Sequence, residues 1–319
     1  MKPPYEITQE ILRLITLISV QIGEINAKYL IKTDPILRKQ NQIKTIHSSL
    51  SIEGNTLTEE QITAIIENKR VIGPQKDIIE VLNTLEVYKN IRNLKSSSEK
   101  DFLKAHKMLL LNLIKTPGKY RSQGVGIVKG SKVEHIAPPY ENVPFLMKDL
   151  FQYLKDKSEI ALIKSCVFHY EMEFIHPFLD GNGRMGRLWQ TLILMEAYPI
   201  FEFLPFETLI SKNQNAYYNA LSISDKQGKS TVFIEYMLSI INKSLDDVLS
   251  NSVKKLTESN RIDLFLEEND KDFTRKDYLN YFKEISSSTA SRDLKKAVDD
   301  NLIIKIGDKK TTVYRKIYT

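Results

Sequence analysis

Hydrophobic residues recur every three or four positions through the first 30 residues of the chain. They are Ile7, Ile11, Ile15, Ile18, Ile22 and Ile25. This spacing places them on one face of an α-helix, so the segment is predicted to form a single amphipathic helix. Asp34 and Pro35 then mark the start of a second helix that reaches about Ser51, because aspartate caps free amides and proline is tolerated in the first turn.

The same helical spacing continues along most of the chain. Thr58 and Gln61 form a capping box that opens a third helix, which Gly73 and Pro74 end. Further helices are predicted over residues 76–95, 99–115, 143–155, 159–174, 183–197, 211–224 and 230–257. Between them, the glycine- and proline-rich residues 117–140 contain a β-branched stretch, Val125 to Val128, which predicts a loop with a small β-hairpin.

The pattern changes after about Ser259. Three helical stretches are followed by two β-rich stretches around Gly307 and Asp308, an order that predicts a winged helix-turn-helix module. We therefore expect a mainly α protein. Its predicted parts are a helical N-terminal region at 1–95, a helical core at 96–257 and the C-terminal module at 258–319.

Composition and charge narrow the class of protein. A chain of 319 residues that is 42% hydrophobic and 27% charged is typical of a soluble globular protein, neither disordered nor fibrous. Its net charge of +6 permits an anionic partner such as a nucleotide or a nucleic acid. Cys166 is the only cysteine and lies in an apolar run, so we expect a buried thiol and a reducing compartment. We find no export signal and no membrane-spanning segment, and we predict a cytoplasmic location with no membrane partner.

The segment FIHPFLDGNGRMGRLW carries the strongest chemical signal. Gly181, Asn182 and Gly183 can adopt left-handed or unusual backbone angles, which lets successive amides converge on an anion. The helix that follows adds its free N-terminal amides and the positive end of its dipole. Arg184 and Arg187 are three residues apart and share a face of that helix, so both are expected to point at one polyphosphate.

Two further side chains of this segment suit phosphate chemistry. Asp180 stands at the entrance of the loop, where a carboxylate can hold Mg²⁺ together with substrate phosphates. His176 lies just outside the loop, and an imidazole titrates near neutrality, so it can take a proton from an incoming hydroxyl. The segment is therefore predicted to be an active site.

The run HPFLDGNGRMGR resembles the signature of the Fic family, HxFx(D/E)GNGRxxR, at every specified position. The resemblance implies an all-helical Fic core with a small hairpin flap. It also implies adenylyl transfer, in which ATP and Mg²⁺ bind and AMP moves to a serine, threonine or tyrosine hydroxyl of a protein. His176 is then the general base and Asp180 the Mg²⁺ ligand.

The same resemblance assigns the phosphate contacts. Gly181, Asn182 and Gly183 form the anion hole for the α- and β-phosphates. Arg184 holds the β-phosphate and Arg187 the γ-phosphate. The implied reaction is an in-line attack on the α-phosphorus with pyrophosphate leaving, and it needs no covalent intermediate on the enzyme.

A second match lies far upstream, in SLSIEGN. Ser49, Glu53 and Gly54 resemble the (S/T)xxxE(G/N) pattern of Fic proteins that carry an N-terminal inhibitory helix. The resemblance implies that Glu53 pairs with Arg187 and occupies the guanidinium that the γ-phosphate needs. ATP then binds in a pose unsuited to attack. Some members of the family also use this glutamate to remove AMP, and the sequence leaves open whether this chain does.

Two weaker matches concern the substrates. The stretch that begins at Val125 resembles the family's flap, whose edge pairs with the backbone of the target protein. The glycines at 124 and 126 leave its register open. Tyr217 and Tyr218 resemble the tyrosine pair that lines the adenine pocket, although helical core aromatics would show the same pattern.

Several alternatives remain open at the level of sequence. A second hypothesis is that the chain is a DNA-binding regulator that uses the Fic core as a nucleotide sensor. The C-terminal module carries basic residues that suit phosphate contacts: Arg292, Lys295, Lys296, Lys309 and Lys310. Three acidic residues, Asp293, Asp299 and Asp300, argue against a purely basic face. Related folds transfer UMP or phosphocholine. The sequence does not determine the target protein or whether the chain forms a homodimer. It also leaves open whether the C-terminal module binds DNA or protein.

Overall fold

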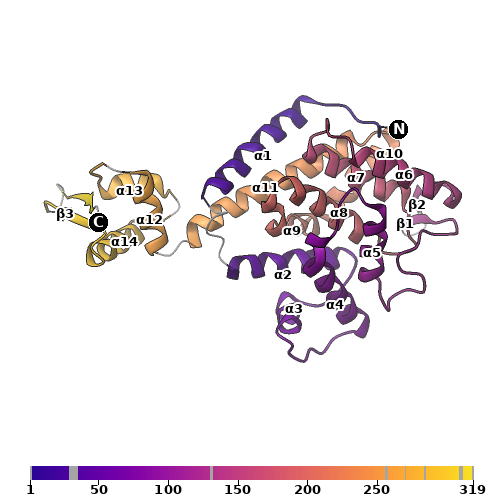
Figure 1. Ribbon diagram of the computed structural model, residues 1–319, viewed down its shortest axis with the longest axis horizontal. Helices are drawn as coiled ribbons and strands as arrows, with labels where there is room; N and C mark the ends of the chain where they lie inside the picture. The colour runs from indigo at the N-terminus through magenta and orange to yellow at the C-terminus, as the bar shows by residue number, and fades with distance from the viewer. Residues whose placement is uncertain are drawn as a thin grey trace. The chain divides into compact units, whose positions relative to one another are not determined.

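A computed structural model of the chain describes residues 2–28, 35–129, 132–255, 258–269, 271–283, 285–308 and 312–317. The chain forms two compact units, Met1–Leu245 and Asp246–Thr319. Figure 1 shows that the first unit is built of helices with one small hairpin. Within the described residues, no helix is long and apolar enough to cross a bilayer. Lys309 and Lys310 lie outside the described residues.

The helices of the first unit follow the predicted order. They are α1 Gln9–Lys28, α2 Pro35–Ile52, α3 Glu59–Ile66, α4 Gln75–Asn90, α5 Glu99–Leu109, α6 Val143–Leu154, α7 Ala161–Ile175, α8 Asn182–Ala197, α9 Glu207–Lys212, α10 Gln214–Gln227 and α11 Thr231–Lys255, which continues into the second unit. Three 3-10 helices connect them: η1 Ile91–Asn93, η2 Tyr140–Asn142 and η3 Pro199–Phe203. The mainly α fold class is therefore confirmed.

Several predicted helix boundaries are wrong. Helix α1 begins at Gln9, so Ile7, which was predicted to lie on its apolar face, precedes the helix and is 49% exposed. The other errors each have a local reason. Helix α3 ends at Ile66 and not near Gly73, because Asn68 adopts a left-handed angle with φ 56°. Helix α5 ends at Leu109, shortly before Asn112 with φ 63°. The single helix expected over 211–224 is two helices, because the Asn213 side chain caps the start of α10 by accepting from the Ala216 amide.

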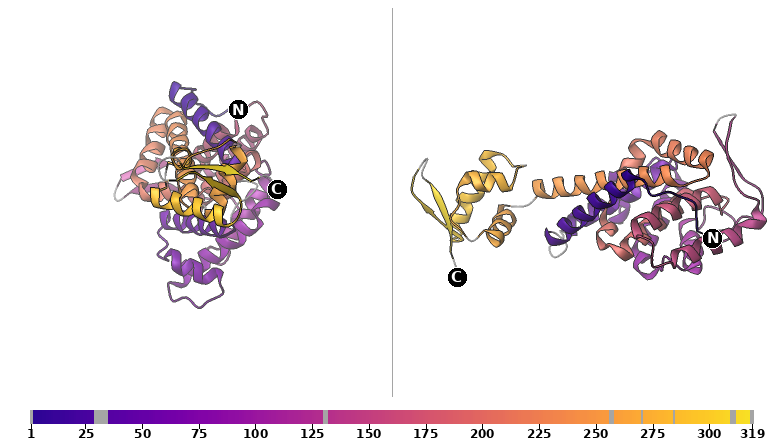
Figure 2. Two further views of the ribbon diagram at one scale, coloured as in Figure 1. Left: turned by 90° about the vertical axis from the view of Figure 1, so that its left-hand side faces the viewer. Right: turned by 90° about the horizontal axis from the view of Figure 1, so that it is seen from above.

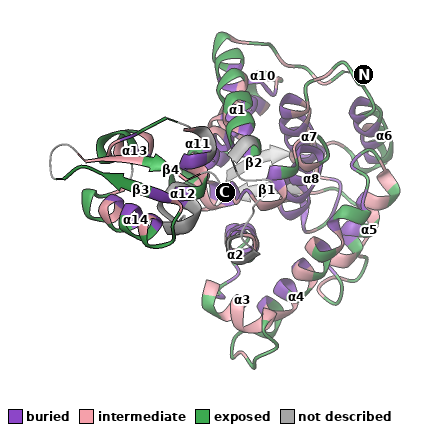
Figure 3. Cartoon of the chain, turned by 60° about the vertical axis from the view of Figure 1, so that its left-hand side comes forward, coloured by how far each residue is buried: buried purple, intermediate pink, exposed green. Residues whose placement is uncertain are grey.

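Helices α7 and α8 form the centre of the first unit and pack against each other. Figure 3 shows both helices as largely buried. Between them and α5, a cluster of aromatic rings fills the core: Phe102 lies 5.0 Å from Trp189, 5.4 Å from Phe178 and 6.0 Å from Phe168, measured between ring centroids. Burial of such rings stabilises the fold and fixes the two helix ends that carry the candidate site. Cys166 is a buried free thiol in this core, as expected.

The predicted hairpin is present between α5 and α6. Strand β1 Gly126–Lys129 pairs antiparallel with β2 Lys132–Ile136, and the register shifts between Ile127 and Val128. Figure 2 shows the hairpin projecting from the helices of the first unit.

The second unit contains the elements predicted for its sequence. Helices α12 Glu258–Glu268, α13 Arg275–Tyr281 and α14 Ser287–Asp299 precede an antiparallel pair, β3 Ile303–Ile306 and β4 Val313–Lys316. Its core includes Phe265, Tyr278, Phe282 and Leu294. The winged-helix reading of this arrangement and its DNA contacts stay predictions.

One expectation for this unit was wrong. Asp293 does not contribute to the surface of α14, because its side chain is fully buried. It accepts hydrogen bonds from Arg261 Nε at 2.6 Å and from the Tyr278 hydroxyl at 3.1 Å. Asp293 is therefore the buried counter-charge of Arg261, and it does not reduce the positive charge of the exposed face of α14.

Candidate active site

His176 is the C-terminal cap of α7 and adopts a left-handed conformation, with φ 49° and ψ 59°. The sequence causes this break, because the residue before a proline is disfavoured in the helical region and Pro177 follows directly. The His176 amide still donates to the Met172 carbonyl at 3.0 Å. The helix therefore ends by turning the half-buried imidazole toward the loop at Leu179 to Gly181.

Arg121 fixes this turn, and sequence reasoning missed it. Its buried guanidinium donates from Nε to the His176 carbonyl at 2.8 Å, from Nη2 to the Ile175 carbonyl at 3.3 Å and from Nη1 to the Gln123 carbonyl at 3.0 Å. A further bond reaches the Pro138 carbonyl. Arg121 thus ties the catalytic turn to both ends of the hairpin. An arginine in a glycine-rich loop has no spacing pattern from which this role follows.

The three residues predicted to form an anion cup lie at the start of α8, and each has a different structural role. Only Gly181 is left-handed, with φ 86°; Gly183 lies in regular helix. The Asn182 side chain accepts from the Phe178 amide and donates to the Phe178 carbonyl, both at 2.9 Å, so it holds the loop closed. The free backbone amides of the first turn of α8 are left to receive an anion.

Gly183 is required for space and not for backbone angle. A Cβ atom at this position would lie 2.4 Å from Glu53 Oε1 and 3.0 Å from Arg187 Nη1. The expectation that Gly183 takes an unusual angle was therefore wrong. The start of α8 has no space for a side chain at position 183 because the ion pair between Glu53 and Arg187 occupies it.

That ion pair joins α8 to the end of α2. Arg187 Nη2 donates to Glu53 Oε1 at 2.7 Å and to the Ser49 carbonyl at 3.0 Å, and Nε donates to Ser49 Oγ at 3.1 Å. Burial lowers the pKa of Arg187, but Glu53 and other acidic neighbours more than offset this and hold the pKa above its ordinary value. Gly54, with φ 89°, makes the turn that ends α2. Ser49 and Glu53 therefore both contact Arg187, and Gly54 makes the turn that follows them.

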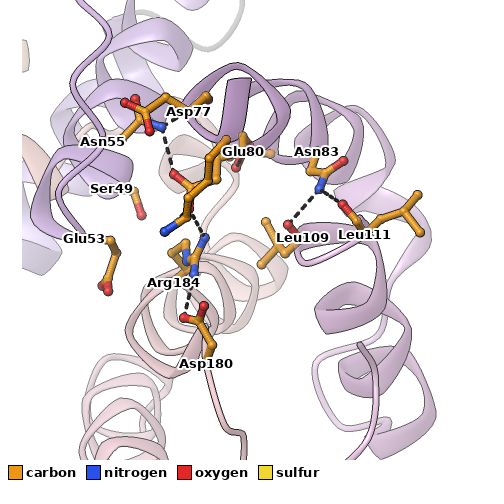
Figure 4. Close-up of polar contacts among 12 residues, drawn as sticks. Ser49, Glu53, Asn55, Asp77, Glu80, Asn83, Leu109, Leu111, Asp180 and Arg184 are labelled. Carbon is orange, nitrogen blue, oxygen red and sulfur yellow. Dashed lines mark hydrogen bonds and ion pairs between the residues drawn. The ribbon is translucent and has the colours of Figure 1, made fainter. Parts of the chain in front are cut away.

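Arg184 departs from the expected geometry. Its Nη1 donates to Glu80 Oε1 at 3.0 Å and its Nη2 donates to Asp180 Oδ1 at 2.9 Å (Figure 4). The side chain is buried, and Arg184 is not among the described residues that line the cavity described below. Arg187 therefore lines the cavity directly, whereas Arg184 contacts the cavity-lining Asp180.

A cavity of about 340 Å³ opens at the start of α8. It is lined by Glu53, Glu173, His176, Leu179, Asp180, Gly181, Asn182, Gly183, Arg187, Tyr217 and Tyr218. Its volume falls in the range of small-molecule sites, and its lining combines an imidazole, an anion cup and a cation. Val125 lies at the base of the hairpin and is not in this lining among the described residues.

The tyrosine pair lies at the cavity, but the two rings differ in exposure. Tyr217 is buried, and its hydroxyl donates to His169 Nε2 at 3.0 Å, while His169 Nδ1 donates to Gln190 Oε1 at 2.6 Å. Burial lowers the pKa of His169 to about 3, so this ring stays neutral and can accept from the tyrosine. Tyr218 is exposed and packs edge-to-face on Tyr217 at 5.3 Å between centroids.

The entrance carboxylate suits a Mg²⁺ ion that is shared with a substrate. Asp180 lines the cavity, and its side chain is 45% exposed. No group of three His, Cys, Asp or Glu side chains able to hold a metal occurs within the described part of the chain. Because Mg²⁺ commonly binds through one or two carboxylates plus phosphate oxygens, the Asp180 carboxylate fits an ion that enters with a nucleotide.

His106 supports this loop from behind. The Gly118 amide donates to His106 Nδ1 at 2.8 Å, so Nε2 carries the proton and donates to the Asp180 carbonyl at 3.0 Å. The ring also stacks on Phe178 at 3.6 Å between centroids. Burial lowers the pKa of His106 to about 4. His106 therefore has a structural role, which is to hold the backbone of the Asp180 loop.

Comparisons with known proteins agree with this site. A model of the Fic/DOC family matches residues 96–194. The protein adenylyltransferase fic-1 of Caenorhabditis elegans is 28% identical over 236 residues, and that of Caenorhabditis briggsae is 31% identical over 205 residues. These matches cover 66% and 60% of this chain, but only 44% and 38% of the relatives. The chain thus spans less than half the length of these curated relatives.

A solved structure extends the likeness to the whole chain. The Fic family protein from Desulfovibrio desulfuricans G20 is 38% identical, with a TM-score of 0.77. The alignment covers 100% of this chain and 99% of that one. Because similarity of this degree runs from end to end, and because the motif residues lie together in one cavity, this chain belongs to the Fic family.

Proposed function

We propose that this chain transfers AMP from ATP to a hydroxyl group of a protein, and that Glu53 restrains the reaction. The observation that carries the proposal is the placement of His176, the backbone cup of α8 and Arg187 around one cavity. The relatives named protein adenylyltransferase support the same activity.

The chemistry follows from what each group offers. The imidazole of His176 accepts the proton of the target hydroxyl while the oxygen attacks the α-phosphorus, and pyrophosphate leaves. The amides at the start of α8 stabilise the charge that develops on the phosphate oxygens. When bound at Asp180, Mg²⁺ neutralises phosphate charge. Arg121 holds the turn that orients His176.

The restraint follows from competition for one guanidinium. The Arg187 nitrogen that would receive the γ-phosphate donates to Glu53 at 2.7 Å. A charge-assisted bond of this kind is short and strong, so a nucleotide must displace the carboxylate to bind in a productive pose. The Glu53 side chain is 28% exposed, which allows it to turn toward solvent. Nucleotide binding and restraint therefore meet at the same arginine.

The test compares two variants of the full chain incubated with α-labelled and γ-labelled ATP. Glu53→Gly should raise incorporation of the α-label at least about tenfold, the effect of losing one strong charge-assisted bond. His176→Ala in the Glu53→Gly background should abolish it. The γ-label should stay in solution, because pyrophosphate leaves.

Two controls define the result. Equal incorporation by wild type and Glu53→Gly would remove the restraint, and transfer of the γ-label would replace adenylyl transfer with phosphoryl transfer. Labelled GTP, UTP and CTP, offered in parallel, test the preference for ATP. Mass spectrometry of the labelled proteins identifies the modified hydroxyl.

A further inference from the structure

The guanidinium of Arg184 lies between two carboxylates of different exposure (Figure 4). Glu80 on α4 accepts from Nη1 at 3.0 Å, and Asp180 at the cavity accepts from Nη2 at 2.9 Å. The Glu80 side chain is 5% exposed, whereas that of Asp180 is 45% exposed. One partner is thus fixed in the core, and the other can be reached by a ligand.

Glu80 is itself held by Asn55. The Asn55 side-chain amide donates to Glu80 Oε2 at 2.8 Å and to the Asp77 carbonyl at 3.1 Å, and its oxygen accepts from the Leu57 amide at 3.1 Å. Both carboxylate oxygens of Glu80 are therefore engaged. Rotation of the carboxylate would leave buried polar groups unsatisfied, so Glu80 is a rigid anchor.

Asn55 belongs to the turn that carries Glu53. Its backbone amide donates to the Leu50 carbonyl at 3.1 Å, across the left-handed Gly54. The short segment after α2 therefore reaches both arginines: Glu53 directly contacts Arg187, and Asn55 contacts Arg184 through Glu80.

We propose that Glu80 is a positioning residue for Arg184: it fixes one end of the guanidinium so that the other end can exchange Asp180 for the β-phosphate of the nucleotide. Without the anionic Glu80, the guanidinium has Asp180 as its remaining carboxylate partner. It would then close on Asp180 with both terminal nitrogens and be lost to the ligand. The inference rests on the proposed binding of an adenine nucleotide.

The test measures dissociation constants of ADP and AMP by calorimetry, using full-length Glu53→Gly protein as the parent. Neither ligand can be turned over by adenylyl transfer, and only ADP has a β-phosphate. Adding Glu80→Gln should weaken ADP binding about tenfold, the effect of one lost hydrogen bond to a charged group. AMP binding should change less than about twofold, because AMP makes no contact with Arg184.

A matched control separates positioning from general damage to α4. Asp77 is buried on the same helix, but its carboxylate accepts from the Thr56 amide at 2.8 Å and the Thr56 hydroxyl at 2.7 Å. Asp77→Asn should therefore leave the ratio of ADP to AMP affinity unchanged, even where the melting temperature falls. Glu80→Asp keeps the charge one methylene away, and it should give an intermediate ratio.

The outcomes are distinguishable. Equal weakening of ADP and AMP by Glu80→Gln, or an unchanged ratio, would overturn the positioning role. If Glu80→Gln does not fold, an unchanged ratio in Glu80→Asp overturns it equally. A parent protein that binds neither ADP nor ATP would instead contradict the proposed function.

Discussion

The two arginines of the motif lie one helical turn apart, yet the carboxylates that hold them differ in how far they are exposed to solvent. Arg187 is held by the buried Ser49 and by Glu53, whose carboxylate is 28% exposed. Arg184 is held by Glu80, a carboxylate that is only 5% exposed. On the Arg187 side the negative charge can leave, whereas on the Arg184 side it is locked in the core.

This difference separates regulation from support. A carboxylate near solvent loses little hydration when it pairs, so its pairing can be reversed by a ligand. A buried carboxylate depends on its partner, because removal of that partner leaves an uncompensated charge. We infer that the Arg187 side suits a switch and that the Arg184 side suits a fixed scaffold.

The largest expected effect is on the free energy of unfolding, and it tests the contrast between Arg184 and Arg187. Arg184→Ala leaves the buried Glu80 carboxylate without its main cation, with Lys76 Nζ at 3.9 Å as its remaining ion-pair partner among the described residues. The substitution should lower the free energy of unfolding by about 3 kcal/mol or more. Arg187→Ala should cost less, because Glu53 can turn toward solvent. Urea unfolding of both variants measures the difference.

A second substitution sharpens that comparison. Adding Glu80→Gln to Arg184→Ala removes the stranded charge and should recover part of the lost stability. No recovery, or a larger loss for Arg187→Ala than for Arg184→Ala, would contradict the assignment of Glu80 as the dependent partner.

A smaller effect should appear with pH, since each arginine has a neutral buried histidine near it. Burial lowers the pKa of His106 to about 4 and that of His169 to about 3, below the value of about 6.5 in the unfolded chain. The unfolded chain therefore binds more protons between these values. The stability contributed by these two rings is fully present above pH 6.5 and is lost as the pH falls.

The expected loss is about 1 kcal/mol for each histidine between pH 7 and pH 5.5. Urea unfolding at both pH values measures it, and His106→Gln or His169→Gln should each remove its own share of the pH dependence. Wild type alone is not the test, because burial also raises the pKa of Glu171 to about 7 and that of Glu207 to about 8, and both shifts favour the folded state as the pH falls. A histidine variant whose pH dependence equals that of wild type would show that its ring is not held neutral.

The smallest effect belongs to Ser49→Ala. The substitution removes one hydrogen bond to Arg187 Nε, a loss of about 1 kcal/mol, and leaves the Ser49 carbonyl contact in place. Because Arg187 is then held less firmly against α2, adenylyl transfer should rise about twofold to fivefold, well below the effect of Glu53→Gly. Labelled ATP incorporation measures it, and a rise equal to that of Glu53→Gly would show that Ser49 and not Glu53 is the main restraint.

The sequence by itself determined the helical order and the local chemistry. Helical spacing predicted α1, the Thr58 and Gln61 capping box is present, and the His176–Pro177 step ends α7 because proline restricts the residue before it. The motif from His176 to Arg187 was recognisable because all of its residues lie on one short loop and the helix that follows. Such patterns are readable from sequence, since neighbours in the chain remain neighbours in space.

Only the tertiary structure decided which groups hold that motif. Glu80, Asn55 and Arg121 have no distinctive spacing relative to His176. They reach the site because Glu80 of α4 contacts Arg184, Asn55 contacts Glu80, and Arg121 of the loop before the hairpin contacts the end of α7. The packing also explains why position 183 is glycine, and it holds Arg184 between Glu80 and Asp180. Contacts between residues 25 to 138 positions apart depend on how helices pack, because local backbone preferences do not act over such distances.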